Sequence, residues 1–366
     1  MMDATTAAAT VFSTSYEEAR SRFLDAAHKA GAGLERFDNP NPGPTGGTLS
    51  TDTAFVGDPD APCLLVITSA CHGVEGFTGS GAQLDWLLGD RRLPDGVAML
   101  LVHAINPHGF AWHRRVTEEG CDLNRNFVDF SKPLPENPLY DEIADAIVPR
   151  AWTGPDRDAA DAVLADAIAR HGLNAVMAAM ASGQHRHPTG IFYGGIAPTW
   201  SRQTFETIRD RHAFGARRHV CHIDIHTGLG QFGHGELITL HPPDSGGVER
   251  AVAWWGPSCA PMGGAGSVAT PRTGLMPDAV EAVASGRYTF GALEFGTHPS
   301  VRGRLALRAD HWLHAHSGLP WDHPTAEAIR AELTEFFFPV DPSWRELVVF
   351  RTRQVIGRAL AGLTQV

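Results

Sequence analysis

Short runs of branched apolar residues, each bounded by Gly, Pro or Asp, recur along the chain. They predict strands at 51–56, 63–69, 97–104, 219–225, 236–241 and 288–295. Longer stretches with the composition and spacing of amphipathic helices predict helices at 15–30, 78–89, 155–181, 201–213, 304–316, 324–337 and 342–361. Strands interleaved with helices predict an α/β fold with a largely parallel or mixed sheet that is buried on both faces.

Two segments interrupt this pattern. Residues 39–44 contain three prolines and predict a loop before the core begins. Between residues 131 and 200 the pattern changes to Pro-rich turns and an Ala/Asp-rich helix, which we interpret as an insertion or a substrate-covering subregion. No linker is long enough to separate this segment, so we expect residues 1–366 to form a single domain.

The composition excludes several classes of partner. Hydrophobic residues make up 43% and charged residues 19% of the chain, which is typical of a soluble globular protein. Thirty basic against 41 acidic residues give a net charge of −11, so we expect neither nucleic acid nor an anionic membrane as a partner.

The sequence also favours a cytoplasmic location. Residues 1–20 lack a basic segment followed by a long apolar segment, so we expect no secretory signal, and no run of 18 apolar residues predicts a membrane span. The cysteine count is odd, and the five residues lie mostly in apolar contexts, as expected for buried reduced thiols.

Histidines and carboxylates follow the apolar runs at their carboxyl ends. His72 and Glu75 stand between glycines after the first central run, His226 follows residues 219–225, and Glu294 ends another run. Sites in open α/β sheets gather at the carboxyl ends of strands, and a charge there is costly unless it is paired or bound to metal. We therefore expect these four residues to converge on one site.

The residue types suggest a catalytic zinc site. His72, Glu75 and His226 would supply two imidazoles and one carboxylate, leaving the fourth position of the metal open to water. Glu294 would then be the general base for that water. Because Gly73 and Gly76 permit positive φ angles, we expect residues 69–76 to form a strand-end loop, not the helical H-E-x-x-H arrangement.

Further polar residues between 114 and 126 fit the same site. Arg115, by preference over the adjacent Arg114, would stabilise an oxyanion. Asn124 and Arg125 would hold a substrate carboxylate, and Asp122 would accept a hydrogen bond from the far nitrogen of His72.

Each ligand also has a purely structural interpretation. His72 can be a loop histidine, Glu75 a carboxylate favoured at a helix start, and His226 a hydrogen-bonded core histidine. Glu294 can be paired with a buried arginine. Cys71 flanks the first ligand, and we expect it to be a small buried residue and not a ligand. The joint occurrence of these residues favours the metal site.

Four motifs in order resemble those of the zinc carboxypeptidase superfamily over about residues 50–300: His72-Gly-Val-Glu75, Asp122-Leu-Asn-Arg125-Asn-Phe, Asp224-Ile-His226-Thr-Gly and Glu294-Phe-Gly. The closest resemblance is to a bacterial branch of metallopeptidase-like proteins labelled as a domain of unknown function. It implies a mixed, mainly parallel eight-stranded sheet between helices.

The resemblance also implies residue roles. It assigns one Zn²⁺ per chain to His72, Glu75 and His226, and catalysis to Glu294. It further implies that Asp122 orients the first histidine and that Arg115 stabilises the oxyanion. Asn124 and Arg125 would bind the substrate's terminal carboxylate.

We therefore expect a zinc-dependent hydrolase that cleaves an amide bond in a small peptide, as a metallopeptidase or carboxypeptidase does. Residues 265–280 lack the tyrosine that the best-known members carry on a loop before the catalytic glutamate, which favours hydrolysis in general over strict carboxypeptidase specificity. One alternative is a deacylase of N-acyl amino acids, like aspartoacylase and succinylglutamate desuccinylase. Another is a catalytically silent binding protein, although pure binding does not require Glu294. The sequence specifies neither the substrate nor the oligomeric state.

Overall fold

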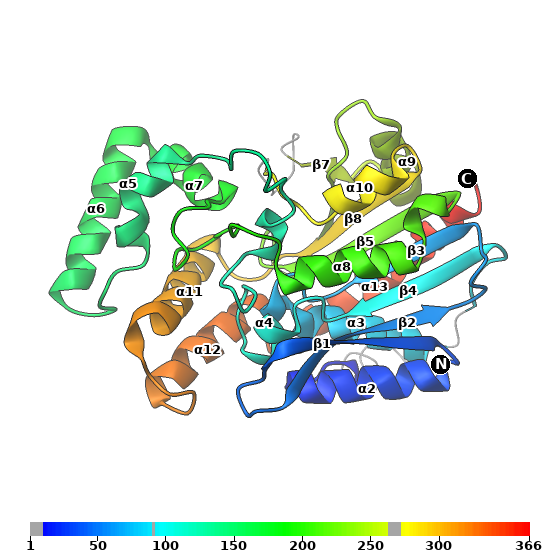
Figure 1. Cartoon of the computed structure of the whole chain (residues 1–366), viewed down its shortest axis with the longest axis horizontal. Helices are drawn as coiled ribbons and strands as arrows, with labels where there is room; N and C mark the ends of the chain where they lie inside the picture. The colour runs from blue at the N-terminus through cyan, green and yellow to red at the C-terminus, as the bar shows by residue number, and fades with distance from the viewer. Residues whose placement is uncertain (1–9, 90–91, 263–271) are drawn as a thin grey trace.

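The computed structural model describes residues 10–89, 92–262 and 272–366. Within them, eight strands form one sheet in the order β1-β2-β4-β3-β5-β8-β6-β7 (Figure 1). The strands are β1 (Gly33–Pro42), β2 (Thr48–Val56), β3 (Cys63–Thr68), β4 (Val97–His103), β5 (His219–Thr227), β6 (Gly235–Thr239), β7 (Ala260–Pro261) and β8 (Tyr288–Phe295). The central neighbours β4, β3, β5 and β8 are parallel, whereas β1, β2 and β6 join through antiparallel pairs. The predicted mixed, mainly parallel sheet is confirmed.

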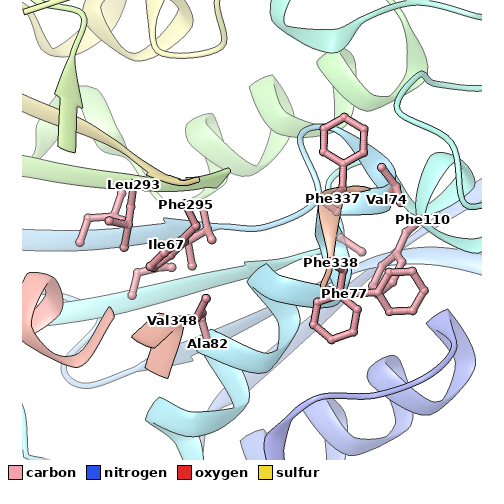
Figure 2. Packing of buried hydrophobic residues seen from close by; sticks show 14 of the residues in the cluster. Ile67, Val74, Phe77, Ala82, Phe110, Leu293, Phe295, Phe337, Phe338 and Val348 are labelled. Carbon is pink, nitrogen blue, oxygen red and sulfur yellow. The ribbon is translucent and has the colours of Figure 1, made fainter. Parts of the chain in front are cut away.

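Side chains alternate between the two faces along each central strand, and helices cover the apolar side chains on both faces. Leu65 and Ile67 of β3 pack in one core with α2 (Tyr16–Lys29), α3 (Gly76–Leu88), α9 (Gly246–Trp255) and α13 (Pro342–Leu363). Figure 2 shows Ile67 in this core, near Val348 of α13. Leu64 and Val66 point the other way, into a second core with α8 (Trp200–Arg211) and α10 (Asp278–Ala284).

A third group of helices lies beside the carboxyl ends of the central strands. It contains α5 (Pro138–Ile147), α6 (Pro155–His171), α7 (Leu173–Ser182), α11 (Ser300–Trp312) and α12 (Pro324–Phe337), and Figure 1 shows α5, α6 and α7 clustered at the left of the view. The single helix predicted at 155–181 is two helices, because Gly172 between them adopts a φ of 85°. The predicted insertion at 131–200 thus supplies α5, α6 and α7.

The loop predicted at 39–44 is wrong for residues 39–42. β1 extends through Pro40 to Pro42 and pairs with β2. β1 is at the edge of the sheet, where one row of backbone amides has no partner strand. Proline, which lacks an amide hydrogen, is therefore tolerated there. Helices α5, α9 and α10 and the short α4 (Pro107–Ala111) were not predicted.

Two expectations about the whole chain can be compared with the structure. Among the described residues, no helix is long and apolar enough to cross a membrane. All five cysteines are buried and free of disulfides, as predicted.

Candidate metal centre and pocket

The first two candidate ligands lie on a turn that leaves β3. After Ala70, whose φ is 59°, the chain forms the short 3-10 helix η1 (Gly73–Glu75) and continues into α3. The amide of Gly73 donates to the carbonyl of Arg115 at 3.0 Å, which joins this turn to the loop that carries the candidate oxyanion arginine.

The glycines of this turn are required for close packing. A Cβ on Gly73 would lie 2.1 Å from the carbonyl carbon of Gly109 in α4, and one on Gly76 would lie 2.6 Å from the ring of Phe110. Neither glycine has a positive φ, so the prediction of positive-φ turns is wrong. Figure 2 shows Val74, from the same turn, beside Phe110, so the turn rests on the aromatic part of the core.

The third ligand and the candidate base come from adjacent strands. His226 of β5 is paired in register with Glu294 of β8. Paired residues on neighbouring strands project to the same face of a sheet, with the strands about 4.8 Å apart. Both residues therefore face the space into which η1 brings His72 and Glu75.

The three predicted ligands converge with the geometry of a metal site. His72 Nδ1 lies 2.9 Å from Glu75 Oε1, His226 Nδ1 lies 3.0 Å from Glu75 Oε2, and the two Nδ1 atoms are 3.2 Å apart. Ligands bound tetrahedrally to zinc at about 2.0–2.1 Å lie about 3.3 Å from one another. All three side chains are buried, and the spacing of their donor atoms fits one ion.

Carboxylates stand behind both imidazoles. Asp122 Oδ1 lies 3.4 Å from His72 Nε2, and Asp224 Oδ2 lies 2.6 Å from His226 Nε2. The hydroxyl of Thr68 also donates to Asp224 at 2.6 Å. At His226, the carboxylate on the far nitrogen fixes the tautomer in which Nδ1 is free to bind metal. At His72, Arg115 Nη2 lies nearer to Nε2 than Asp122 does, at 2.7 Å.

A competing group of potential ligands, Cys71, Asp224 and His226, lies on the other side of the His226 ring. Cys71 and Asp224 are fully buried, and neither lines the cavity that His72 and Glu75 line. The first group is therefore the one with members, His72 and Glu75, that reach the cavity.

The structure distinguishes between the two adjacent arginines. Arg115 lines the cavity, donates through Nε to Asp122 Oδ2 at 3.0 Å, and has Nη2 2.7 Å from His72 Nε2. Arg114 instead donates through Nε to Asp310 of α11 at 3.1 Å. Arg115 is thus the arginine beside the candidate ligands.

The cavity over these residues has a volume of about 380 Å³. Glu294 lines it, and its Oε1 accepts a hydrogen bond from the amide of Leu229 at 3.0 Å. Burial, reinforced by the nearby Glu75 carboxylate, raises the pKa of Glu294 to about 7. The opposite wall is largely apolar and includes Met177, Ala178, Ala181, Leu307, Phe336 and Phe337.

The predicted carboxylate-binding pair is not part of this wall. Arg125 donates to the backbone carbonyls of Asn124, Ala181 and Ser182, at 2.7, 2.6 and 3.2 Å. Asn124 accepts a hydrogen bond from the amide of Met276. Neither side chain lines the cavity, and neither do His226 and Asp122. The candidates that line it are His72, Glu75, Arg115 and Glu294.

Two residues of the site were missed. Asp224 was named only as part of the motif around His226 and was given no role. Its signal was its position: two residues before His226 in the same strand, it projects to the same face of the sheet as the histidine. Arg272, which lines the cavity, follows no apolar run and gave no periodic signal. It lies in the segment expected to carry a tyrosine, of which residues 265–271 fall outside the described part of the chain.

Comparison with protein families places the chain. Residues 12–351 match the family described as "Protein of unknown function (DUF2817)", and the chain belongs to this family. This confirms the expected membership of a family labelled as of unknown function. A search of curated proteins found no match.

Several solved structures are similar at low identity. Thrombin activatable fibrinolysis inhibitor (TAFI) is 12% identical, with a TM-score of 0.44, over 88% of this chain and 73% of that one. Glutaminyl cyclase of Porphyromonas gingivalis is 10% identical, with a TM-score of 0.41, over 97% and 98%. Succinylglutamate desuccinylase of Chromobacterium violaceum is 14% identical, with a TM-score of 0.36, over 87% and 74%.

Proposed function

We propose that the protein is a zinc-dependent hydrolase of amide bonds. The observation that carries the proposal is the convergence of the donor atoms of His72, Glu75 and His226 beside a cavity that His72, Glu75 and Glu294 line. Glu294 is a carboxylate near the three ligands that is not needed as a ligand itself. Hydrolysis requires such a base, whereas metal storage does not require one.

The donor set fits zinc. Two imidazole nitrogens and one carboxylate oxygen are a common ligand set of catalytic zinc, in which the fourth position stays open. The cavity reaches His72 and Glu75, so a fourth position faces solvent and substrate. We therefore propose one Zn²⁺ per chain.

When bound, Zn²⁺ would acidify a water molecule and polarise the carbonyl of the amide. Glu294 would accept a proton from that water and pass it to the leaving nitrogen. Arg115 would donate to the developing oxyanion. Asp224 would hold His226 in the metal-binding tautomer. Asp122 would do the same for His72 once Arg115 Nη2, now 2.7 Å from His72 Nε2, turns to the substrate.

The cavity limits the substrate to a small molecule. A volume of about 380 Å³ is near the lower end of the range for small-molecule sites. Its apolar wall is expected to contact a hydrophobic side chain or acyl group. We propose a small peptide, cleaved in the manner of a metallopeptidase or carboxypeptidase, with an N-acyl amino acid as the alternative substrate. The free buried cysteines favour a reducing compartment, and we propose the cytoplasm.

A hydrolysis screen tests the proposal. Dipeptides and N-acyl amino acids would be incubated with protein of measured metal content, with and without chelator. We expect about one zinc per chain and chelator-sensitive cleavage of at least one substrate class. Protein that binds no zinc, or zinc-loaded protein that cleaves neither class, would contradict the proposal.

A single substitution separates metal binding from turnover. Glu294→Gln should keep the metal and lower kcat by about 10²–10⁴-fold, because the amide cannot accept the proton. The matched control is Glu17→Gln, an exposed glutamate on α2. Unchanged kcat in the Glu294 variant would remove the base from the mechanism.

A further inference from the structure

Arg272 is a cation at the cavity with no partner in the described part of the chain. It lines the cavity together with Glu75, Arg115 and Glu294. Its Nε is buried without a hydrogen-bond partner, and no ion pair engages its guanidinium among the described residues. An unpaired buried donor of this kind costs free energy unless a ligand satisfies it.

The charge balance of the site points to an anionic ligand. Four carboxylates surround the metal position: Glu75, Asp122, Asp224 and Glu294. The two charges of a zinc ion, with Arg115 and Arg125, balance them. The guanidiniums of Arg272 and Arg304, which both line the cavity, are then in excess, so a substrate that brings negative charge would offset it. Burial, with the neighbouring Arg115, lowers the pKa of Arg272.

The other arginines are already engaged. Arg125 is bound to three backbone carbonyls and lies outside the cavity lining. Arg304 of α11 also lines the cavity, but its Nη1 donates to Ser300 Oγ at 3.2 Å. Arg115 is bonded to Glu75 and Asp122. Among the described residues, Arg272 is the arginine of the cavity for which no hydrogen bond is made, whereas Arg115 and Arg304 each make at least one.

We propose that Arg272 binds the carboxylate of the substrate, in place of Asn124 and Arg125. The inference rests on the proposed function and specifies it: the scissile amide belongs to a molecule with a free carboxylate, held by the planar guanidinium while the amide lies over His72 and Glu294. The apolar wall of Met177, Ala178 and Leu307 would then contact the uncharged part of the same molecule.

Binding and turnover should be measured in parallel. N-acetyl-L-phenylalanine and its carboxamide serve as probes, titrated calorimetrically into zinc-loaded Glu294→Gln protein with and without Arg272→Gln. We expect the acid to bind more tightly than the carboxamide, and Arg272→Gln to weaken binding of the acid about 10- to 100-fold while binding of the carboxamide is unchanged. Zinc content and thermal stability should stay at their original values, since Arg272 makes no hydrogen bond in the described structure.

Arg304→Gln is the matched control, because it removes the same charge from the same cavity. The proposal is overturned if the acid and the carboxamide bind equally, or if the preference for the acid is lost in Arg304→Gln or Arg125→Lys but kept in Arg272→Gln. These outcomes concern binding alone. The proposed hydrolysis fails separately, when zinc-loaded protein with Glu294 intact turns over none of the screened substrates.

Discussion

Replacing Asp224 by asparagine tests whether the buried carboxylate behind His226 tunes the metal centre. Oδ2 of Asp224 lies 2.6 Å from His226 Nε2, and Oδ1 accepts from the Thr68 hydroxyl at the same distance. If the amide keeps its oxygen on Thr68, its NH₂ group faces Nε2. The ring proton must then move to Nδ1, the atom 3.0 Å from Glu75 that would bind metal. If the amide is reversed, His226 still exchanges a charged acceptor for a weaker neutral one.

In either orientation, zinc affinity should fall by about 10- to 100-fold, the usual effect of losing a carboxylate behind a ligating histidine. This corresponds to about 1.4–2.7 kcal/mol of binding free energy. Titration of zinc against a competing chelator measures the loss, and calorimetry of the metal-free protein separates it from any change in folding. Thr68→Val is the matched control, because it removes the Thr68 donor and leaves the carboxylate on His226. A folded Asp224→Asn protein that binds zinc within about threefold of the wild type would refute the tautomer argument.

Two further predictions concern stability. Burial, with the neighbouring Glu119, raises the pKa of Glu118 from 4.5 to about 7. The folded state therefore holds the proton more tightly, and this contribution to stability is complete below pH 4.5 and lost as the pH rises through 7, up to about 3 kcal/mol. Urea unfolding at pH 5 and pH 8 should show a smaller decrease for Glu118→Gln than for the wild type, and equal decreases would contradict the assignment. Gly73→Ala should destabilise the fold by about 3 kcal/mol or more, because its Cβ meets the backbone of Gly109 at 2.1 Å. Gly47→Ala, at an exposed position with no atom within 4 Å of the new Cβ, should change the melting temperature little, and a similar effect of both would argue against the close contact.

The sequence predicted the centre of the sheet because its strands are buried on both faces and read as continuous apolar runs. β3 and β8 were found within one residue of their observed ends. β1 was missed because its prolines normally end a strand, and only its place at the sheet edge makes them acceptable. Periodicity says nothing about which strand will be at an edge.

The candidate ligands could be predicted for a related reason. His72, His226 and Glu294 each follow an apolar run, so the chain order itself places them at one edge of the sheet. The surroundings of an arginine are set by the fold and not by its neighbours in sequence. Two of the three backbone carbonyls that engage Arg125 come from α7, more than fifty residues away in the chain, and Arg272 reaches the cavity from a segment without a repeating pattern.

The cavity has two walls of different origin. Thr227 and Glu294 are fixed by the hydrogen-bonded strands β5 and β8, whereas Met177 and Ala178 project from α7, in the segment 131–200 that departs from the pattern of the core. Reaction chemistry and substrate size are therefore separable properties of this protein. A library of substitutions confined to the cavity-facing positions of α7 should yield enzymes that accept larger or smaller molecules while the reacting groups keep their positions, which makes this helix the natural place to redesign selectivity.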